Sequence, residues 1–144
     1  MKVKRIISVL ISILFLLCAV SAAAESKELS VSALDQYVYD TDTIRFNNFT
    51  ISEGNNMFTD PDGFNHVKIQ VSGRNKTNSS YYVQLQIAGF GHDGTLLWAM
   101  KVAPTMGILS EKSLEQLSGT AWVRPDTLSE TKKIRIIYAG DFLN

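Results

Sequence analysis

Apolar residues recur at every second position along most of the chain after residue 25, and this period constrains the fold more than any other feature. Val67, Ile69 and Val71 alternate with polar residues, and the run from Tyr81 to Ile87 repeats the pattern. Such alternation buries one side-chain face and leaves the other in solvent, as in a half-buried β-strand. Further inward sets are expected from Leu29, Val31, Ala33, Ile44, Phe46, Phe49, Ile51, Leu96, Trp98, Met100, Val102, Ala121, Val123, Ile134, Ile136 and Tyr138.

Turn-forming residues separate these runs, and Asn47-Asn48 predicts a bulge or turn between two of the inward sets. The turn signals are Asp60-Pro61-Asp62-Gly63, segment 73–80, His92-Asp93-Gly94, Gly107 and Pro125-Asp126. About seven strands with regular turns predict an all-β protein, a single immunoglobulin-like antiparallel β-sandwich. The sandwich is expected over residues 41–144, with residues 25–40 as an N-terminal arm or an edge strand.

One segment departs from the strand pattern. Leu109, Ser113 and Leu117 recur at helical spacing, Ser110 can cap a helix, and Gly119 can end it. The sequence therefore predicts one short helical turn near residues 110–117, linking two strands.

The first 24 residues have the pattern of a secretion signal. Lys2, Lys4 and Arg5 precede an apolar run over residues 6–20, and Ala22 and Ala24 supply the small residues of a cleavage site. The run of about 15 residues is shorter than the roughly 20 that span a bilayer. We expect cleavage after Ala24, no retained transmembrane helix, and an exported protein that is periplasmic or extracellular.

Cys18 is the only cysteine, and cleavage after Ala24 would remove it. The remaining chain would then hold no disulfide and no cysteine metal ligand. A secreted domain of this size without disulfides fits a bacterial envelope better than an animal secretion.

The charge balance argues against nucleic acid as a partner. Residues 25–144 carry 11 Lys and Arg against 14 Asp and Glu, a net charge of −3. An acidic domain has no electrostatic attraction to a phosphate backbone. The basic residues Arg45, Lys68, Lys132, Lys133 and Arg135 do not cluster along the chain, so no anion site is expected from them.

No motif for catalysis or cofactor binding is found. The chain has no G-x-S-x-G elbow, no P-loop and no dinucleotide fingerprint. Only His66 and His92 could serve as imidazole bases. We therefore expect no enzyme and no cofactor.

Acidic and imidazole side chains are expected at one end of the sandwich. In an antiparallel fold the strand that starts near His66 begins where the strand that finishes near Phe90 stops. This places Asp60, Asp62 and His66 at the same end as His92 and Asp93. Carboxylates with imidazoles suit zinc, and the Asp-rich loop alone would suit calcium. Ordinary polar turns are the alternative explanation.

Exposed aromatic rings are candidate ligand platforms. Trp122 is out of phase with Ala121 and Val123, which predicts an outward ring, whereas Trp98 shares the phase of Met100 and Val102 and is expected in the core. Tyr82 would form a polar-aromatic strip with Gln84 and Gln86 if it points outward. Tyr37 and Tyr39 are not assigned to a face.

The run VKIQVSGRNKTNSSYYVQLQIAGFGHDGTLLW resembles bacterial FxLYD-type immunoglobulin-like domains, over about residues 66–139. Gly73, Asn75, Phe90, Asp93 and Gly94 occupy places comparable to that family's pattern. Leu117-Ser118-Gly119 is similar to its later Leu-x-Pro-Gly turn, with Ser118 in place of proline. The Leu-Tyr-Asp of the family name is absent. The resemblance implies an extracytoplasmic accessory or binding role.

These observations predict a non-enzymatic binding or accessory protein that acts through protein–protein interaction in the cell envelope. Three alternatives stay open. A carbohydrate-binding module would need Trp122 and at least one tyrosine coplanar on one face. A small metal-binding protein would use the His66 and His92 end. An inhibitor of a secreted enzyme would present a loop at residues 103–110 or 125–131.

Overall fold

The computed structural model of this chain describes residues 25–55 and 63–142. The predicted signal segment with Cys18 and the candidate ligands Asp60 and Asp62 lie outside these residues. The strands are β1 (Ser26–Ser30), β2 (Tyr39–Asp40), β3 (Ile44–Asn55), β4 (Asn65–Asn75), β5 (Tyr81–Phe90), β6 (Leu96–Val102), β7 (Ile108–Leu109), β8 (Leu114–Val123) and β9 (Lys133–Phe142). A 3-10 turn η1 (Val31–Ala33) and a short helix α2 (Thr127–Glu130) complete the elements.

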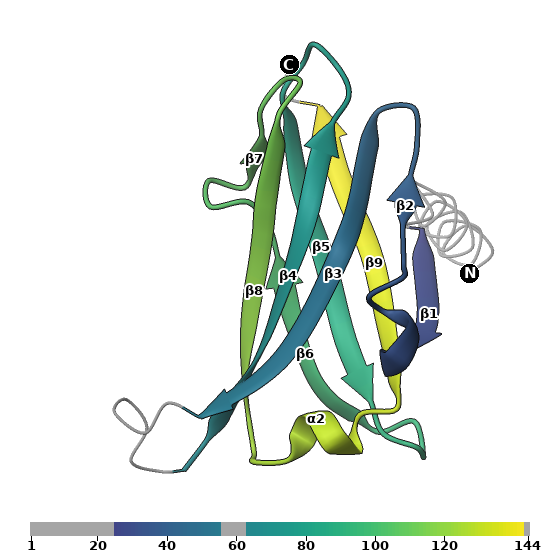
Figure 1. The fold of residues 1–144 in the computed structure, drawn as a ribbon, viewed down its shortest axis with the longest axis vertical. Helices are drawn as coiled ribbons and strands as arrows, with labels where there is room; N and C mark the ends of the chain where they lie inside the picture. The colour runs from purple at the N-terminus through teal and green to yellow at the C-terminus, as the bar shows by residue number, and fades with distance from the viewer. Residues whose placement is uncertain (1–24, 56–62, 143–144) are drawn as a thin grey trace, which may run out of the picture.

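The strands form two antiparallel sheets that pack face to face (Figure 1). The five-stranded sheet has the order β1-β9-β5-β6, and β7 also pairs with β5. The four-stranded sheet has the order β2-β3-β4-β8. The predicted all-β sandwich is confirmed.

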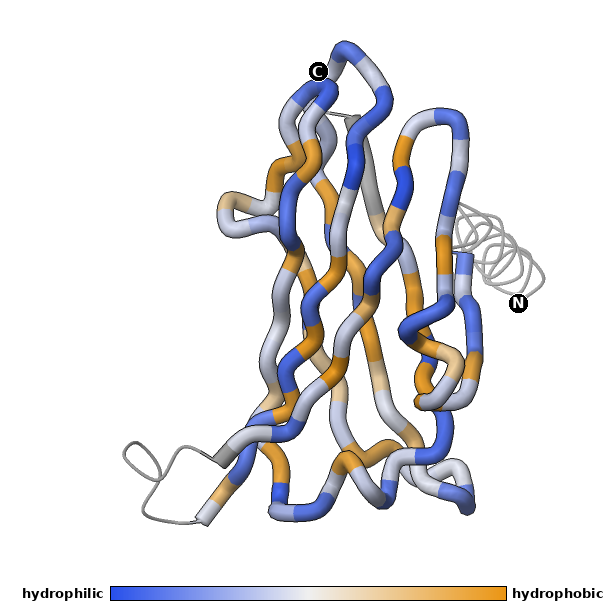
Figure 2. Tube along the Cα trace, viewed as in Figure 1, coloured by the Kyte–Doolittle hydropathy of each residue, from blue (hydrophilic) through white to orange (hydrophobic). Residues whose placement is uncertain are grey.

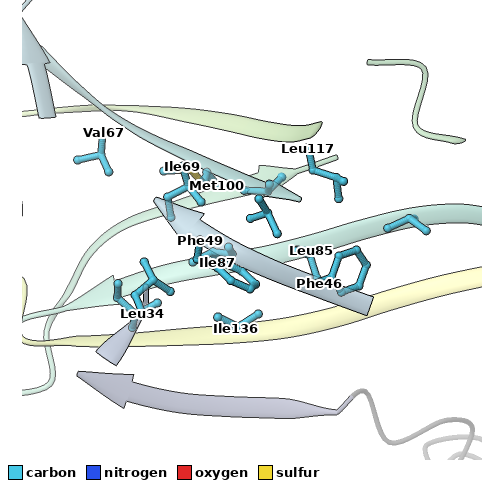
Figure 3. Packing of buried hydrophobic residues seen from close by; sticks show 14 of the residues in the cluster. Leu34, Phe46, Phe49, Val67, Ile69, Leu85, Ile87, Met100, Leu117 and Ile136 are labelled. Atoms are coloured by element: carbon cyan, nitrogen blue, oxygen red, sulfur yellow. The ribbon is translucent and has the colours of Figure 1, made fainter. Parts of the chain in front are cut away.

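The core lies between the sheets and follows the period-2 pattern. Figure 2 shows hydrophobic and hydrophilic residues alternating along the central strands. Inward residues of β3, β4 and β5 meet in the middle, among them Phe46, Ile69 and Ile87, which are at most 1% exposed (Figure 3). Leu34, after η1, is equally buried, so residues 31–34 cover the open side of the sandwich. Next to them, β1 forms the edge of the five-stranded sheet by pairing with β9.

A bulge in β3 keeps both of its phenylalanines in the core. The register with β4 shifts between Asn47 and Thr50, and Asn48 adopts a left-handed φ of 53°. The shift returns Phe49 to the inner face that Phe46 already occupies. The predicted irregularity at Asn47-Asn48 is confirmed as a β-bulge within one strand.

A second bulge corrects the expectation for Leu96. Trp98 pairs with Gly89, but Leu96 pairs with Phe90, so Leu97 is an extra residue in β6. Leu96 therefore leaves the inner face and is 56% exposed, whereas Trp98 is buried as predicted. The indole fills the space over Gly89, where a Cβ would lie 2.2 Å from the ring.

The helical turn expected near residues 110–117 is wrong. Residues 111–112 form a turn in which Lys112 has a φ of 51°, and residues 114–123 form β8, which pairs with β4 over ten residues. Leu109 and Leu117 are both buried, but they belong to different strands rather than to one helical face. Pairing with β4 stabilises the extended form more than local spacing can stabilise a helix. The short helix of the fold is α2, at Thr127–Glu130.

Val31 and Ala33 also differ from expectation, because they belong to η1 instead of continuing the alternation of β1. Within residues 25–55 and 63–142, no helix is long and apolar enough to cross a membrane.

Candidate functional site

Tyr82 points outward, so the outer face of the five-stranded sheet has the polar-aromatic strip that the sequence analysis made dependent on this orientation. Inward and outward residues alternate strictly along β5, and the outward set includes Tyr82, Gln84 and Gln86. Tyr82 is 43% exposed. Amide side chains beside an exposed ring can bind a ligand by hydrogen bonds and by apolar contact.

A groove of about 340 Å³ lies on this face, across β6, β5 and β9. The hollow forms there because Ala88 and Ala99, which are paired directly across β5 and β6, have short side chains that leave space above the sheet. Ile137 adds apolar surface from β9. The groove is lined chiefly by Gln84, Gln86, Ala88, Ala99, Lys101, Arg135 and Ile137. Its volume lies at the lower end of the range of small-molecule pockets.

Two cationic side chains, Arg135 and Lys101, lie at the rim of the groove. Arg135 is fixed from two sides: its Nη2 donates to Glu28 Oε2 at 3.1 Å, and its guanidinium lies 4.9 Å from the ring centroid of Phe90. Lys133 also contacts Glu28, and the hydrogen bond from Arg135 is the main reason that the pKa of Glu28 is lowered. Arg135 is thus held in a defined orientation at the groove, which reduces the entropy lost on binding.

Lys101 and Tyr82 separate the groove from a second hollow. Lys101 Nζ lies 3.5 Å from the Tyr82 hydroxyl and 5.7 Å from the centre of its ring. The second hollow, about 550 Å³, lies between this pair, Ser118 of β8 and the loop over residues 103–107. One continuous surface of the protein therefore holds two concave regions and an aromatic ring between them.

The loop over residues 103–107 projects from the sandwich beside β7 (Figure 1). A hydrogen bond from Gly107 N to Pro104 O, 2.9 Å, closes a tight turn, and Gly107 has a φ of 73°. Met106 in this turn is 81% exposed. Such exposure of a flexible apolar side chain is typical of contact surfaces.

The three candidate metal ligands among the described residues lie on two separate parts of the fold. His66 lies on the outer face of β4, with its ring over Gly54 and at 5.9 Å from the ring of Trp122. His92 and Asp93 lie in the turn after β5. The carboxylate of Asp93 accepts hydrogen bonds from Thr95 N and Thr95 Oγ1, and the backbone bond is the main cause of its lowered pKa. The described residues contain no group of three His, Cys, Asp or Glu that could hold a metal ion.

The two candidate aromatic rings lie on opposite faces of the molecule. Trp122 is 60% exposed on the outer face of the four-stranded sheet, whereas Tyr82 is on the outer face of the other sheet. Tyr37 and Tyr39 are half-buried between the sheets, in contact with Phe49 and Phe46 respectively. The structure therefore does not bring Trp122 and any of these tyrosines into one flat platform.

Comparisons with protein-family models, curated proteins and solved structures find no match to this chain. Two residues of the FxLYD-like pattern have structural roles. A Cβ on Gly73 would lie 2.5 Å from Leu117 Cδ1, so glycine makes room for the core. Asn75 is buried and donates to three backbone carbonyls.

The sequence reasoning missed most of the groove. Lys101, Arg135, Ala88 and Ala99 come from three strands, and only the strand order places them together. One feature of the sequence does point to the groove. Ala88 and Ala99 are small apolar residues at outward positions, where strands usually carry polar or β-branched residues.

Proposed function

We propose that this protein is a non-enzymatic binding or accessory protein that acts through protein–protein interaction, with the outer face of the five-stranded sheet as its binding face. The observation that carries the proposal is the groove of about 340 Å³, with its apolar floor and polar rim. Interaction surfaces combine a desolvated apolar centre with hydrogen-bonding groups around it.

The chemistry of the groove supports a protein partner over a sugar. Aromatic platforms for sugars need rings that lie flat beneath the ligand, whereas alanine and isoleucine form this floor. Tyr82 stands beside the groove and not under it, with its ring against Gly107 and Lys101.

Export to the cell envelope is part of the same proposal and is supported by the signal-like segment. The measurement is mass spectrometry of the protein from its native cells. We expect Glu25 as the N-terminal residue; a retained Met1 or an acylated Cys18 would overturn this part.

A matched pair of variants tests the binding face. Ala99→Phe fills the groove at an exposed strand position, and Thr120→Phe introduces the same ring on the outer face of β8, at another exposed strand position. Each protein is cross-linked in envelope extracts of the source cells. A partner bound by the wild type and by Thr120→Phe but lost with Ala99→Phe supports the proposal. Partners bound equally by all three would refute this face.

The exposed Met106 favours a second candidate, an inhibitor of a secreted enzyme. A projecting turn that is closed by a backbone hydrogen bond and has an apolar tip can insert into an enzyme cleft. The test is the residual activity of secreted serine proteinases in the presence of excess protein. Inhibition that Met106→Asp abolishes would replace the first proposal, and full residual activity with each proteinase would remove this candidate.

A further inference from the structure

Strand register places Lys101 and Arg135 at diagonal corners of the groove. Lys101 pairs with Gln86, which pairs on its other side with Ile137; the next outward row is Ala99, Ala88 and Arg135. Lys101 and Arg135 therefore lie two strand spacings apart across the sheet and two residues apart along the strands. With about 4.8 Å between strands and about 6.8 Å per two residues, their Cα atoms are separated by about 12 Å.

The groove is lined by two positive charges, Lys101 and Arg135, although residues 25–144 as a whole carry a net negative charge. None of the described residues that line it is Asp or Glu. Glu28, which pairs with Arg135, engages one nitrogen of the guanidinium, and a guanidinium has five N–H donors. The groove therefore presents an apolar floor between two positive corners.

We infer that the groove binds an extended acidic polypeptide segment, with carboxylates at positions i and i+4 and an apolar residue at i+2. This inference rests on the proposed binding face. In an extended chain, residues four apart are separated by about 13 Å and point to the same side, as does the residue between them. The two carboxylates reach Lys101 and Arg135 while the central side chain contacts Ala88 and Ala99.

The neighbouring amides fit the same occupant. Gln84 and Gln86 project from β5 into the groove, and each can both donate and accept hydrogen bonds. An extended segment exposes its backbone N–H and C=O groups, which need such partners when they are removed from water. A polysaccharide would gain less from the apolar floor.

The test uses a nine-residue peptide with glutamates four positions apart and valine midway, in an otherwise Ser/Gly sequence. Binding is followed by ¹⁵N NMR titration of the protein from residue 25 to 144. We expect shift changes at Ala88, Ala99 and Ile137, with a Kd on the order of 0.1–1 mM. Raising the salt from about 0.02 M to about 0.5 M should weaken binding, because exposed charges are screened.

Charge variants locate the contacts. Lys101→Gln and Arg135→Gln should each weaken binding by about threefold or more, and Lys68→Gln, on the outer face of the four-stranded sheet, should not change it. The peptide with glutamines in place of the glutamates should bind more weakly by a similar factor. Equal binding of both peptides would overturn the inference.

Two outcomes separate this inference from the proposed function. If Ala99→Phe removes a cellular partner while the acidic peptide does not bind, the binding face stands and the acidic ligand is wrong. If polygalacturonate shifts the groove resonances and the peptide does not, the ligand is an acidic polysaccharide and the peptide assignment is overturned.

Discussion

The carboxylate of Glu53 accepts a hydrogen bond from the backbone N–H of Leu128 at 2.8 Å, although the two residues are 75 positions apart. The same carboxylate accepts bonds from Asp126 N at 2.9 Å and from Asn65 Nδ2 at 2.8 Å. One side chain near the end of β3 thus accepts bonds from the amides of Asp126 and Leu128 at the N-terminus of α2, and so ties the connection between β8 and β9 to β3.

Glu53→Ala should therefore lower the free energy of unfolding by about 1–3 kcal/mol, because three donors lose a charged acceptor. The matched control is Glu130→Ala, which removes an exposed carboxylate from α2 itself. It should change the free energy of unfolding by less than about 0.5 kcal/mol. Urea denaturation followed by circular dichroism measures both. Equal midpoints for the two variants would contradict this account of α2.

The two tryptophans should differ strongly in their contribution to stability. Trp98 is 4% exposed, and its Nε1 donates to Thr131 Oγ1 at 2.9 Å, whereas Trp122 is 60% exposed. Trp98→Ala should cost about 3–5 kcal/mol, and Trp122→Ala less than about 1 kcal/mol.

Trp98→Phe keeps most of the ring volume and allows a measurement if the alanine variant does not fold. Fluorescence gives a second readout, because Trp98→Phe leaves only Trp122 and Trp122→Ala leaves only Trp98. The emission of the buried Trp98 should lie at shorter wavelength than that of the exposed Trp122. A longer-wavelength emission from Trp98 would show that the faces of β6 are assigned wrongly.

The sequence pattern predicted the sheets better than it predicted the groove, for a physical reason. Apolar and polar residues alternate along β4 and β5, and this pattern can be read from neighbouring positions in the sequence. The same alternation decides which side chains are buried. Alternation does not predict β8 over residues 114–120, because the inward position 119 is a glycine and the apolar Leu114 lies on the exposed face. Glycine is needed at 119 by contact with a distant strand, since a Cβ there would lie 2.2 Å from Lys101 O.

The groove depends on the order of strands rather than on any one of them. Lys101 and Arg135 are 34 residues apart, and β5 lies between their strands. Local periodicity contains no information about which strands are neighbours. The positions of Lys101 and Arg135 along the chain therefore give no reason to expect both residues at one concave surface.

Tyr39 should contribute to a loss of stability in alkaline solution. Burial first, and then a hydrogen bond and negative charge from Glu25, raise the pKa of Tyr39 from 10.0 to about 12. The folded state thus holds the phenolic proton more tightly than the unfolded state. This contribution is fully present below pH 10 and is lost as the pH rises toward 12.

The thermal midpoint between about pH 9 and about pH 11 measures this effect. Tyr39→Phe should flatten the decrease, because phenylalanine has no proton to lose. Tyr82→Phe, at an exposed ring, serves as the control and should leave the wild-type slope unchanged. If Tyr39→Phe and the wild type lose stability in parallel, the phenol is not the cause.

Asn75 should be the polar residue that the fold tolerates losing least. It is 1% exposed, and its Nδ2 donates to Ser79 O at 2.7 Å, Ser110 O at 2.9 Å and Leu109 O at 3.2 Å. Its Oδ1 accepts from Thr77 N and Thr77 Oγ1, both at 2.9 Å. One amide therefore joins the β4–β5 turn to the segment between β7 and β8.

Asn75→Asp replaces the donating amide with an acceptor that faces the same carbonyls, and Asn75→Ala leaves those carbonyls without their donor. We expect each variant to cost about 2–4 kcal/mol in the free energy of unfolding, because buried unsatisfied polar groups are expensive. Asn78→Ala, exposed in the same turn, is the matched control and should change it by less than about 0.5 kcal/mol. Hydrogen exchange adds a local readout: Asn75→Ala should speed exchange at Lys112 N, which bonds to Thr77 O across this junction. Unchanged exchange there would mean that the backbone holds the two segments together without the amide.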